Sequence, residues 1–241
     1  MAHFKISFYS ETLGQMTHVN AILPDEKNAP YRTLYLLHGL SDNENAWEAN
    51  VPVGRYVKEY GLAVIMPDAS KSFYTDSVKG DRYYTYISKE LPEKVRQWFP
   101  LSPKREDNFL MGNSMGGYGS LKLCLREHES FCAAAALSPC TDVSIRRMEA
   151  VMVPVFGEDF NIRPEDDLFS LTEKFPVDAE KPRIFMAIGT EDFLYEEAVR
   201  LRNCLSNNEF PIEYREEHGD HTWSFWDKYF REGLKWMLCG E

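Results

Sequence analysis

The chain has 241 residues, of which 44% are hydrophobic and 14% aromatic, a composition that excludes an intrinsically disordered protein. Its net charge of −11 provides no electrostatic attraction to nucleic acid or to an anionic membrane, and we expect neither partner. The N-terminus lacks the continuous apolar stretch of a signal peptide, and no apolar run is long enough to cross a bilayer. Five scattered cysteines without CxxC spacing fit a reducing compartment, so we predict a cytoplasmic protein.

Eight short apolar segments predict the strands of a sheet. The first two, KISFYS (5–10) and HVNAIL (18–23), alternate polar and apolar residues and lie close together, which is typical of an antiparallel pair. The six that follow are almost continuously apolar, as in parallel strands buried on both faces: TLYLLH (33–38), LAVIMP (62–67), NFLMG (108–112), AAAAL (133–137), RIFMAIG (183–189) and IEYRE (212–216).

Helical patterns separate these strands at 53–60, 83–98, 117–128, 195–207 and 223–238. Pro92 lies inside the second of them and predicts a kink or break there. The alternation predicts an α/β fold, in which a mostly parallel eight-stranded sheet carries helices on both faces. We expect residues 1–241 to form a single domain.

The connection after the sixth strand is unusually long. About 45 residues separate AAAAL from RIFMAIG, more than a helical crossover needs. Residues 139–181 are therefore either a decorated crossover or a short cap insertion. Ligands of open α/β sheets bind at the carboxyl edge, where such a cap would lie.

The segment Gly112-Asn113-Ser114-Met115-Gly116 is a G-x-S-x-G motif between an apolar strand and an amphipathic helix. In a nucleophile elbow, the serine sits on a sharp turn above the sheet, and the glycines lack β-carbons that would clash there. The motif alone is weak, but this context strengthens it. We predict that Ser114 is a nucleophile.

A serine needs a base and a group that orients the base. His221 follows the last strand in EEHGDHTWSFW, beside Gly219, and is a better candidate than His218. Without a third ligand, the H-x-x-H spacing predicts no metal, and we expect no cofactor. After the seventh strand, Glu191 and Asp192 are both candidate acids. We favour Asp192, in the chain order Ser…Asp…His.

Acyl transfer also requires hydrogen-bond donors for the oxyanion. We assign this role to the backbone amides of Met115, which follows the nucleophile, and of Leu40, in the turn after the third strand. Six aromatic residues lie near strand ends or in their loops: Trp47, Phe73, Tyr74, Tyr84, Phe193 and Trp223. We expect several of them, with Trp47, Tyr84, Phe193 and Trp223 as the assigned four, to wall the site and leave room for a short acyl group.

The chain resembles the esterase D-like branch of the α/β-hydrolases, and most closely the bacterial tributyrin esterases. The resemblance rests on LLHGLSDNENAW (36–47), SFYTDSVKGDRYYTYISKELP (72–92), GNSMGGYG (112–119), GTEDFLYE (189–196) and HGDHTWSFW (218–226). It implies the α/β-hydrolase fold and places a catalytic triad at Ser114, Asp192 and His221. S-formylglutathione hydrolases, feruloyl and acetylxylan esterases and mycolyltransferases resemble the chain more distantly. Asn113 departs from the usual residue beside the nucleophile.

Together these features predict a serine carboxylesterase that cleaves short-chain acyl esters through an acyl-enzyme intermediate. Three alternatives stay open: an acetyl or feruloyl esterase acting on plant-derived sugars, a thioesterase like S-formylglutathione hydrolase, and a catalytically silent binding module. The chain is shorter than typical formylglutathione hydrolases, which argues against the second. We expect a small-molecule ester as the partner, and assembly into a homo-oligomer is an open alternative.

Overall fold

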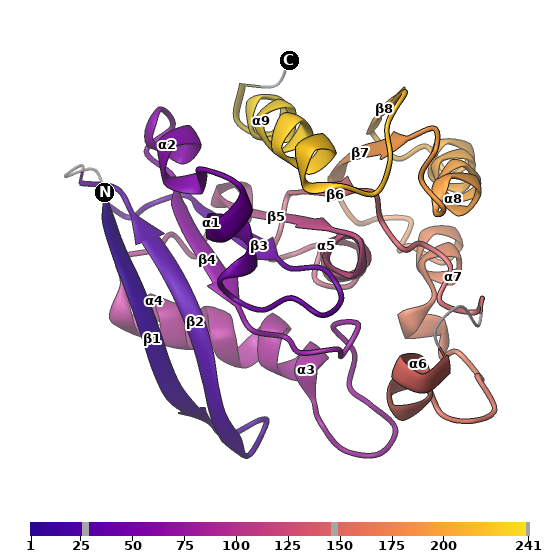
Figure 1. Ribbon diagram of the computed structural model, residues 1–241, viewed down its shortest axis with the longest axis horizontal. Helices are drawn as coiled ribbons and strands as arrows, with labels where there is room; N and C mark the ends of the chain where they lie inside the picture. Colours follow the sequence, from indigo (N-terminus) through magenta and orange to yellow (C-terminus); the bar gives the residue numbers. More distant parts are fainter. Residues whose placement is uncertain (26–28, 146–148, 240–241) are drawn as a thin grey trace.

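The computed structural model describes residues 1–25, 29–145 and 149–239, and in this part of the chain eight strands form one sheet (Figure 1). The spatial order is β1-β2-β4-β3-β5-β6-β7-β8. β1 pairs with β2 and β2 pairs with β4 in antiparallel orientation, and all other neighbouring strands are parallel. The strands are β1 (Ala2–Ser10), β2 (Gln15–Leu23), β3 (Thr33–Leu37), β4 (Ala63–Pro67), β5 (Asn108–Asn113), β6 (Ala133–Leu137), β7 (Arg183–Gly189) and β8 (Ile212–Glu217).

Both faces of the central strands, β3 to β7, are buried, which explains their continuous apolar runs. Every residue of β3 is buried, and its side chains alternate between two separate cores. Tyr35 and Leu37 belong to the core that α4, α5 and α8 cover, whereas Leu34 and Leu36 belong to the core under α2 and α9. The predicted mostly parallel sheet with helices on both faces is confirmed.

Helices connect the strands and cover both faces. They are α1 (Ala46–Asn50), α2 (Val53–Lys58), α3 (Tyr83–Thr85), α4 (Leu91–Trp98), α5 (Met115–Arg126), α6 (Glu149–Phe156), α7 (Leu168–Glu173), α8 (Tyr195–Asn207) and α9 (Trp223–Cys239). In Figure 1, the β1–β2 hairpin lies at one side of the molecule, and α6, α7 and α8 lie at the opposite side. No described helix is long and apolar enough to cross a membrane.

A kink or a break was predicted at Pro92, and the break does not occur, because the helix continues through this position. α3 leads into a π-helical segment, Tyr86–Glu90, and α4 follows directly. The amide of Leu91 donates to the carbonyl of Tyr86, five residues earlier, and Pro92 lies in the first turn of α4. Proline lacks an amide donor, and the wider π register absorbs this loss without ending the helix.

The long connection between β6 and β7 contains α6, a short 3₁₀ helix (Pro164–Asp166) and α7. Residues 146–148 of the predicted 139–181 insertion lie outside the described residues. α6 contributes Met152, Val155 and Phe156 to the same core as α5. The insertion is therefore packed onto the domain and lies beside the carboxyl edge of the sheet.

Candidate active site

Ser114 lies at a sharp turn between a strand and a helix. β5 ends at Asn113 and α5 begins at Met115, and Ser114 between them has φ +54° and ψ −117°. A positive φ is strained for any residue other than glycine and persists only where its surroundings hold it. The Ser114 amide donates to the carbonyl of Leu137 at 2.9 Å, and its carbonyl accepts from the amide of Cys140 at 3.2 Å. This geometry is that of a nucleophile elbow.

The two glycines of the motif allow this turn to pack against β3. A β-carbon on Gly116 would lie 2.3 Å from the carbonyl oxygen of Leu37, and one on Gly112 would lie 2.5 Å from the Gly116 backbone. Both distances are far inside van der Waals contact. Glycine is thus required at both positions for strand and helix to approach so closely.

Asp192 and His221 meet at the same edge of the sheet. Asp192 follows β7 and His221 follows β8, which is the neighbouring strand. The Nδ1 atom of His221 lies 2.8 Å from Oδ2 of Asp192, and the amide of Leu194 donates to Oδ1 at 2.9 Å. The Asp192 side chain is completely buried. A carboxylate held in this way fixes one imidazole orientation and leaves Nε2 free to exchange a proton.

His218 and Glu191 form a separate, exposed pair. Their Nδ1 and Oε1 atoms are 2.9 Å apart, and the His218 side chain is 92% exposed. The amide of Gly219 donates to Glu191 at 2.6 Å, and this hydrogen bond lowers the pKa of the Glu191 carboxyl. The two histidines of the H-x-x-H spacing therefore bind different carboxylates. Among the described residues, no three potential metal ligands gather in one place.

Two aromatic rings hold the imidazole of His221. Its centroid lies 4.7 Å from that of Phe193 and 4.9 Å from that of Trp226. Trp226 is itself fixed, because its indole N–H donates to Oγ of Ser138 at 3.1 Å. The imidazole is thus held by packing on two sides as well as by its hydrogen bond to Asp192.

Ser114 opens into a narrow pocket of about 20 Å³. One water needs roughly 10–15 Å³ of such space, so the pocket is very small. Leu40 and Met115, whose amides we expect to hold an oxyanion, also line it. Among the described residues, no acceptor is found for either amide. The other lining residues are mostly apolar: Phe73, Cys140, Ile145, Met152, Phe193 and Leu194.

Of the four aromatic residues predicted to wall the site, Phe193 lines this pocket. Trp47 is buried, and its indole N–H donates to the carbonyl of Leu37 at 3.0 Å. The hydroxyl of Tyr84 donates to Glu127 at 2.5 Å, away from the pocket. Trp223 packs edge-on against Trp47 at 5.1 Å. These three side chains make other contacts and do not line the pocket, so their prediction as site residues was wrong. The position of an aromatic residue in the sequence does not reveal where its side chain points.

Ile145 and Met152 were not predicted at the site, and Phe73 was among the aromatic candidates but not among the four assigned to it. Ile145 and Met152 come from the insertion, whose apolar residues were a usable signal. Phe73 reaches the pocket because it and Tyr74 both adopt positive φ, +49° and +48°. Nothing in a non-glycine sequence predicts two consecutive left-handed residues.

The sheet topology and the serine turn define a hydrolase of the α/β-hydrolase fold. A family model described as putative esterase matches residues 10–237, and the chain belongs to this esterase family. It is 33% identical over 264 residues to an acetyl esterase from Caldicellulosiruptor saccharolyticus, covering 98% of each protein. The chain is a serine esterase.

Two solved structures from Staphylococcus aureus resemble it throughout. FphF, a fluorophosphonate-binding serine hydrolase, has a TM-score of 0.91 and 32% identity over 98% of each chain. FrmB, an S-formylglutathione hydrolase, has a TM-score of 0.90 with the same identity and coverage. These likenesses confirm the predicted relationship to the esterase D-like hydrolases.

Proposed function

We propose that this esterase cleaves short-chain acyl esters through an acyl-Ser114 intermediate, with His221 as the general base and Asp192 as the orienting acid. The observation that carries the proposal is the hydrogen bond between His221 and the buried carboxylate of Asp192, at the sheet edge where Ser114 lies on its strained turn. A serine becomes an effective nucleophile only beside a base that is oriented in this way.

In the proposed mechanism, Ser114 Oγ attacks the ester carbonyl carbon while Nε2 of His221 takes the hydroxyl proton. The amides of Leu40 and Met115 donate to the oxyanion, and each such donor contributes roughly 3–4 kcal/mol to transition-state stabilisation. When the C–O bond to the alcohol breaks, His221 returns the proton to the leaving oxygen. Water then attacks the acyl-Ser114 carbonyl by the same steps in reverse, releasing the acid and the free serine.

The dimensions of the pocket support a small acyl group. The pocket at Ser114 is very small, about 20 Å³, and its lining is mostly apolar, which suits a short acyl group. The likeness to an acetyl esterase points the same way.

All five cysteines are free thiols, which supports the predicted cytoplasmic location.

Active-site labelling tests the proposal. We expect a fluorophosphonate to label the wild-type protein but not Ser114→Ala, and the hydrolysis of p-nitrophenyl acetate to fall about 10⁴- to 10⁶-fold in the variant. Ser224→Ala, which removes an exposed hydroxyl near His221 in sequence, is the matched control and keeps both properties. A labelled, active Ser114→Ala protein would place the nucleophile elsewhere.

Thioester hydrolysis is a second candidate function, favoured by the 32% identity to an S-formylglutathione hydrolase over 98% of the chain. The same acyl-enzyme chemistry serves a thioester, whose leaving group is a thiolate. A comparison of kcat/KM for S-formylglutathione and for p-nitrophenyl acetate separates the two. A higher kcat/KM for the ester would support ester hydrolysis, whereas a higher value for S-formylglutathione would assign the chain to thioester hydrolysis.

A further inference from the structure

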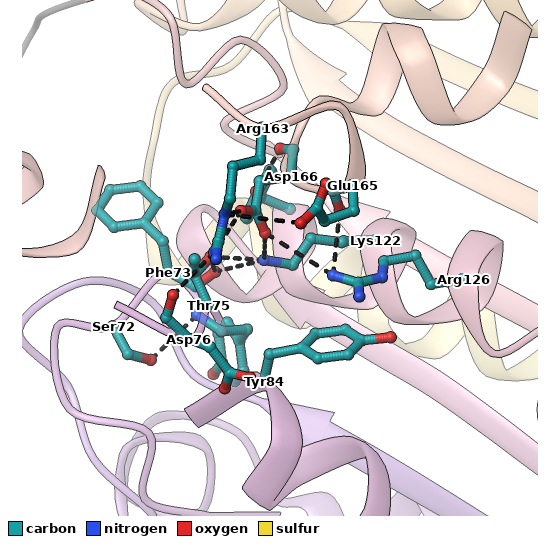
Figure 2. A network of polar contacts seen from close by, with 12 residues as sticks. Ser72, Phe73, Thr75, Asp76, Tyr84, Lys122, Arg126, Arg163, Glu165 and Asp166 are labelled. Atoms are coloured by element: carbon teal, nitrogen blue, oxygen red, sulfur yellow. Dashed lines mark hydrogen bonds and ion pairs between the residues drawn. The ribbon is translucent and has the colours of Figure 1, made fainter. Parts of the chain in front are cut away.

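Lys122 carries a buried positive charge beneath the candidate site. It lies on α5, about two helical turns after Ser114, and its side chain has no exposed surface. The ammonium donates to Thr75 Oγ1 at 2.5 Å, to Asp166 Oδ1 at 3.1 Å and to the carbonyl of Phe73 at 3.4 Å. Figure 2 shows Lys122 reaching from α5 into the middle of this network. A buried charge is stable only with hydrogen-bond or ionic partners of this kind, so the position of the Lys122 ammonium depends on these three acceptors.

Two of the three acceptors belong to the strained turn at residues 72–76. Phe73 and Tyr74 are both left-handed there, with φ +49° and +48°. Such a conformation is sparsely populated and needs contacts that enforce it. Thr75 Oγ1 donates to the carbonyl of Phe73 at 2.8 Å, and the amide of Tyr74 donates to Ser72 Oγ at 3.0 Å. The ammonium of Lys122, which comes from α5, adds two further hydrogen bonds to this turn.

The turn determines where the Phe73 ring lies. That ring lines the Ser114 pocket and packs against Tyr118 at 6.2 Å and Phe156 at 5.8 Å, between α5 and the insertion. The hydroxyl of the next residue, Tyr74, donates to the carbonyl of His38 at 2.9 Å. His38 lies two residues before Leu40 in the chain. One small turn thus contacts the pocket wall and the segment that carries a proposed oxyanion donor.

Asp166 connects the same ammonium to the insertion. Its buried carboxylate also binds Arg163 at 2.6 Å, and its carbonyl accepts from the Tyr118 hydroxyl at 2.6 Å. Arg163 in turn donates to the carbonyl of Asp76 at 2.8 Å (Figure 2). This end of the insertion is therefore fixed to both α5 and the turn.

We propose that Lys122 is a positioning residue which, together with Asp166, holds Phe73 at the end of the acyl pocket and thereby limits the length of the acyl chain. The inference rests on the proposed function, since it requires acyl transfer to Ser114. Lys122 acts through Phe73 and does not itself touch the substrate. Releasing the turn frees the ring to move, and longer acyl chains then fit.

The test compares kcat/KM for p-nitrophenyl acetate, butyrate and octanoate. In Lys122→Met, which keeps side-chain length but has no donor, we expect the octanoate-to-acetate ratio to rise roughly tenfold, the effect of one or two accommodated methylenes. Asp166 keeps its contact with Arg163 in this variant, which favours folding. Thr75→Val removes the same link isosterically and raises the ratio, whereas Thr75→Ser keeps the hydroxyl and leaves it unchanged.

Two further variants separate positioning from general loosening. Arg105→Gln cuts another anchor of the insertion, the 2.7 Å ion pair with Glu180, far from Phe73. It lowers Tm but leaves the ratio at the wild-type value. Phe73→Ala removes the ring itself, and adding Lys122→Met to it produces no further change in the ratio, because both substitutions act through one side chain.

An unchanged ratio in folded Lys122→Met and Thr75→Val proteins would overturn the positioning role. So would additive effects of Lys122→Met and Phe73→Ala. If Lys122→Met fails to fold, the two Thr75 variants decide the matter by themselves. Fluorophosphonate labelling is measured first on the wild type: absent labelling refutes the proposed function, whereas labelled variants with a wild-type ratio refute the positioning role alone.

Discussion

Gly189, the last residue of β7, packs so tightly against Gly219 that a β-carbon on Gly189 would lie 2.1 Å from the Gly219 carbonyl oxygen. The same carbonyl accepts from the amide of Glu191 at 3.0 Å. The segment that carries Asp192 is thereby pressed against the segment that carries His221. The hydrogen bond between these two side chains depends on a backbone contact that only glycine at position 189 permits.

Gly189→Ala is expected to lower kcat/KM for p-nitrophenyl acetate about 100-fold, because a displacement of roughly 1 Å in a catalytic group has an effect of that size. Gly80→Ala is the control, since a β-carbon there meets no atom within 4 Å. Circular dichroism checks that both variants fold. Wild-type turnover in Gly189→Ala would show that the two segments adjust without separating Asp192 from His221.

The two neighbouring carboxylates are expected to differ sharply. Asp192→Asn should lose about 10³- to 10⁴-fold in kcat, because the amide stabilises the wrong imidazole tautomer. Glu191→Gln should stay within a few-fold of the wild type, since its partner His218 is exposed and away from the pocket. Steady-state kinetics on p-nitrophenyl acetate measure both. The reverse ranking would exchange the roles of the two acids.

Acyl-chain preference follows from the size of the pocket. Each methylene that fits contributes about 0.8 kcal/mol, so kcat/KM can rise from acetate to butyrate. Beyond that, the chain has to displace packed side chains such as Phe73 and Met152, at about 1–3 kcal/mol. We expect an optimum at two to four carbons and a steep fall by eight, measured with a series of p-nitrophenyl esters. A maximum at eight or more carbons would contradict the short-chain assignment.

Glu90 is expected to couple stability to pH. Burial alone would raise the pKa of its carboxyl, but hydrogen bonds from Ser10, Thr12 and the Glu11 amide outweigh burial and lower the pKa from 4.5. A lowered pKa stabilises the folded state above pH 4.5, and that contribution is lost as the pH falls further. The carboxylate is only half-buried, so screening by water limits its contribution to about 1 kcal/mol.

Urea unfolding of Glu90→Gln measures this contribution. The variant should be less stable than the wild type at pH 7, and the difference should shrink as the pH falls below 4.5. Glu93→Gln, on the exposed side of α4, provides the comparison, and its free energy of unfolding should equal that of the wild type both at pH 7 and below pH 4.5. A stability difference that is constant with pH would mean that packing, rather than charge, accounts for the effect of Glu90.

The five central strands, β3 to β7, could be predicted because they are buried on both faces and are therefore almost continuously apolar. β1 could be predicted from its alternation of polar and apolar residues, although most of it is exposed. The positions of Ser114, Asp192 and His221 could be predicted for a related reason. Parallel strands bring their carboxyl ends to one edge, so residues that directly follow different strands come together there. The hydrogen bond between Asp192 and His221 agrees with the chain order that was expected.

Side-chain direction was beyond prediction. Trp47 and Tyr84 were expected at the pocket because they lie near strand ends, yet both are anchored elsewhere by their own polar atoms. Phe73 reaches the pocket through two left-handed residues that no local preference favours. Lys122 offered a clearer signal, since a lysine between two leucines on a buried helix needs a partner. The partner, Asp166, is 44 residues away and is identified only once the chain is folded.

The edge-on contact between His221 and Trp226 has an optical consequence. Their rings lie at 89° with centroids 4.9 Å apart. A positively charged imidazole quenches the emission of an indole at contact distance, whereas a neutral one does so weakly. If His221 is the general base, as proposed, the fluorescence of Trp226 is expected to fall while the imidazole carries the proton. Stopped-flow fluorescence would then follow a proton transfer that absorbance at the ester chromophore does not detect.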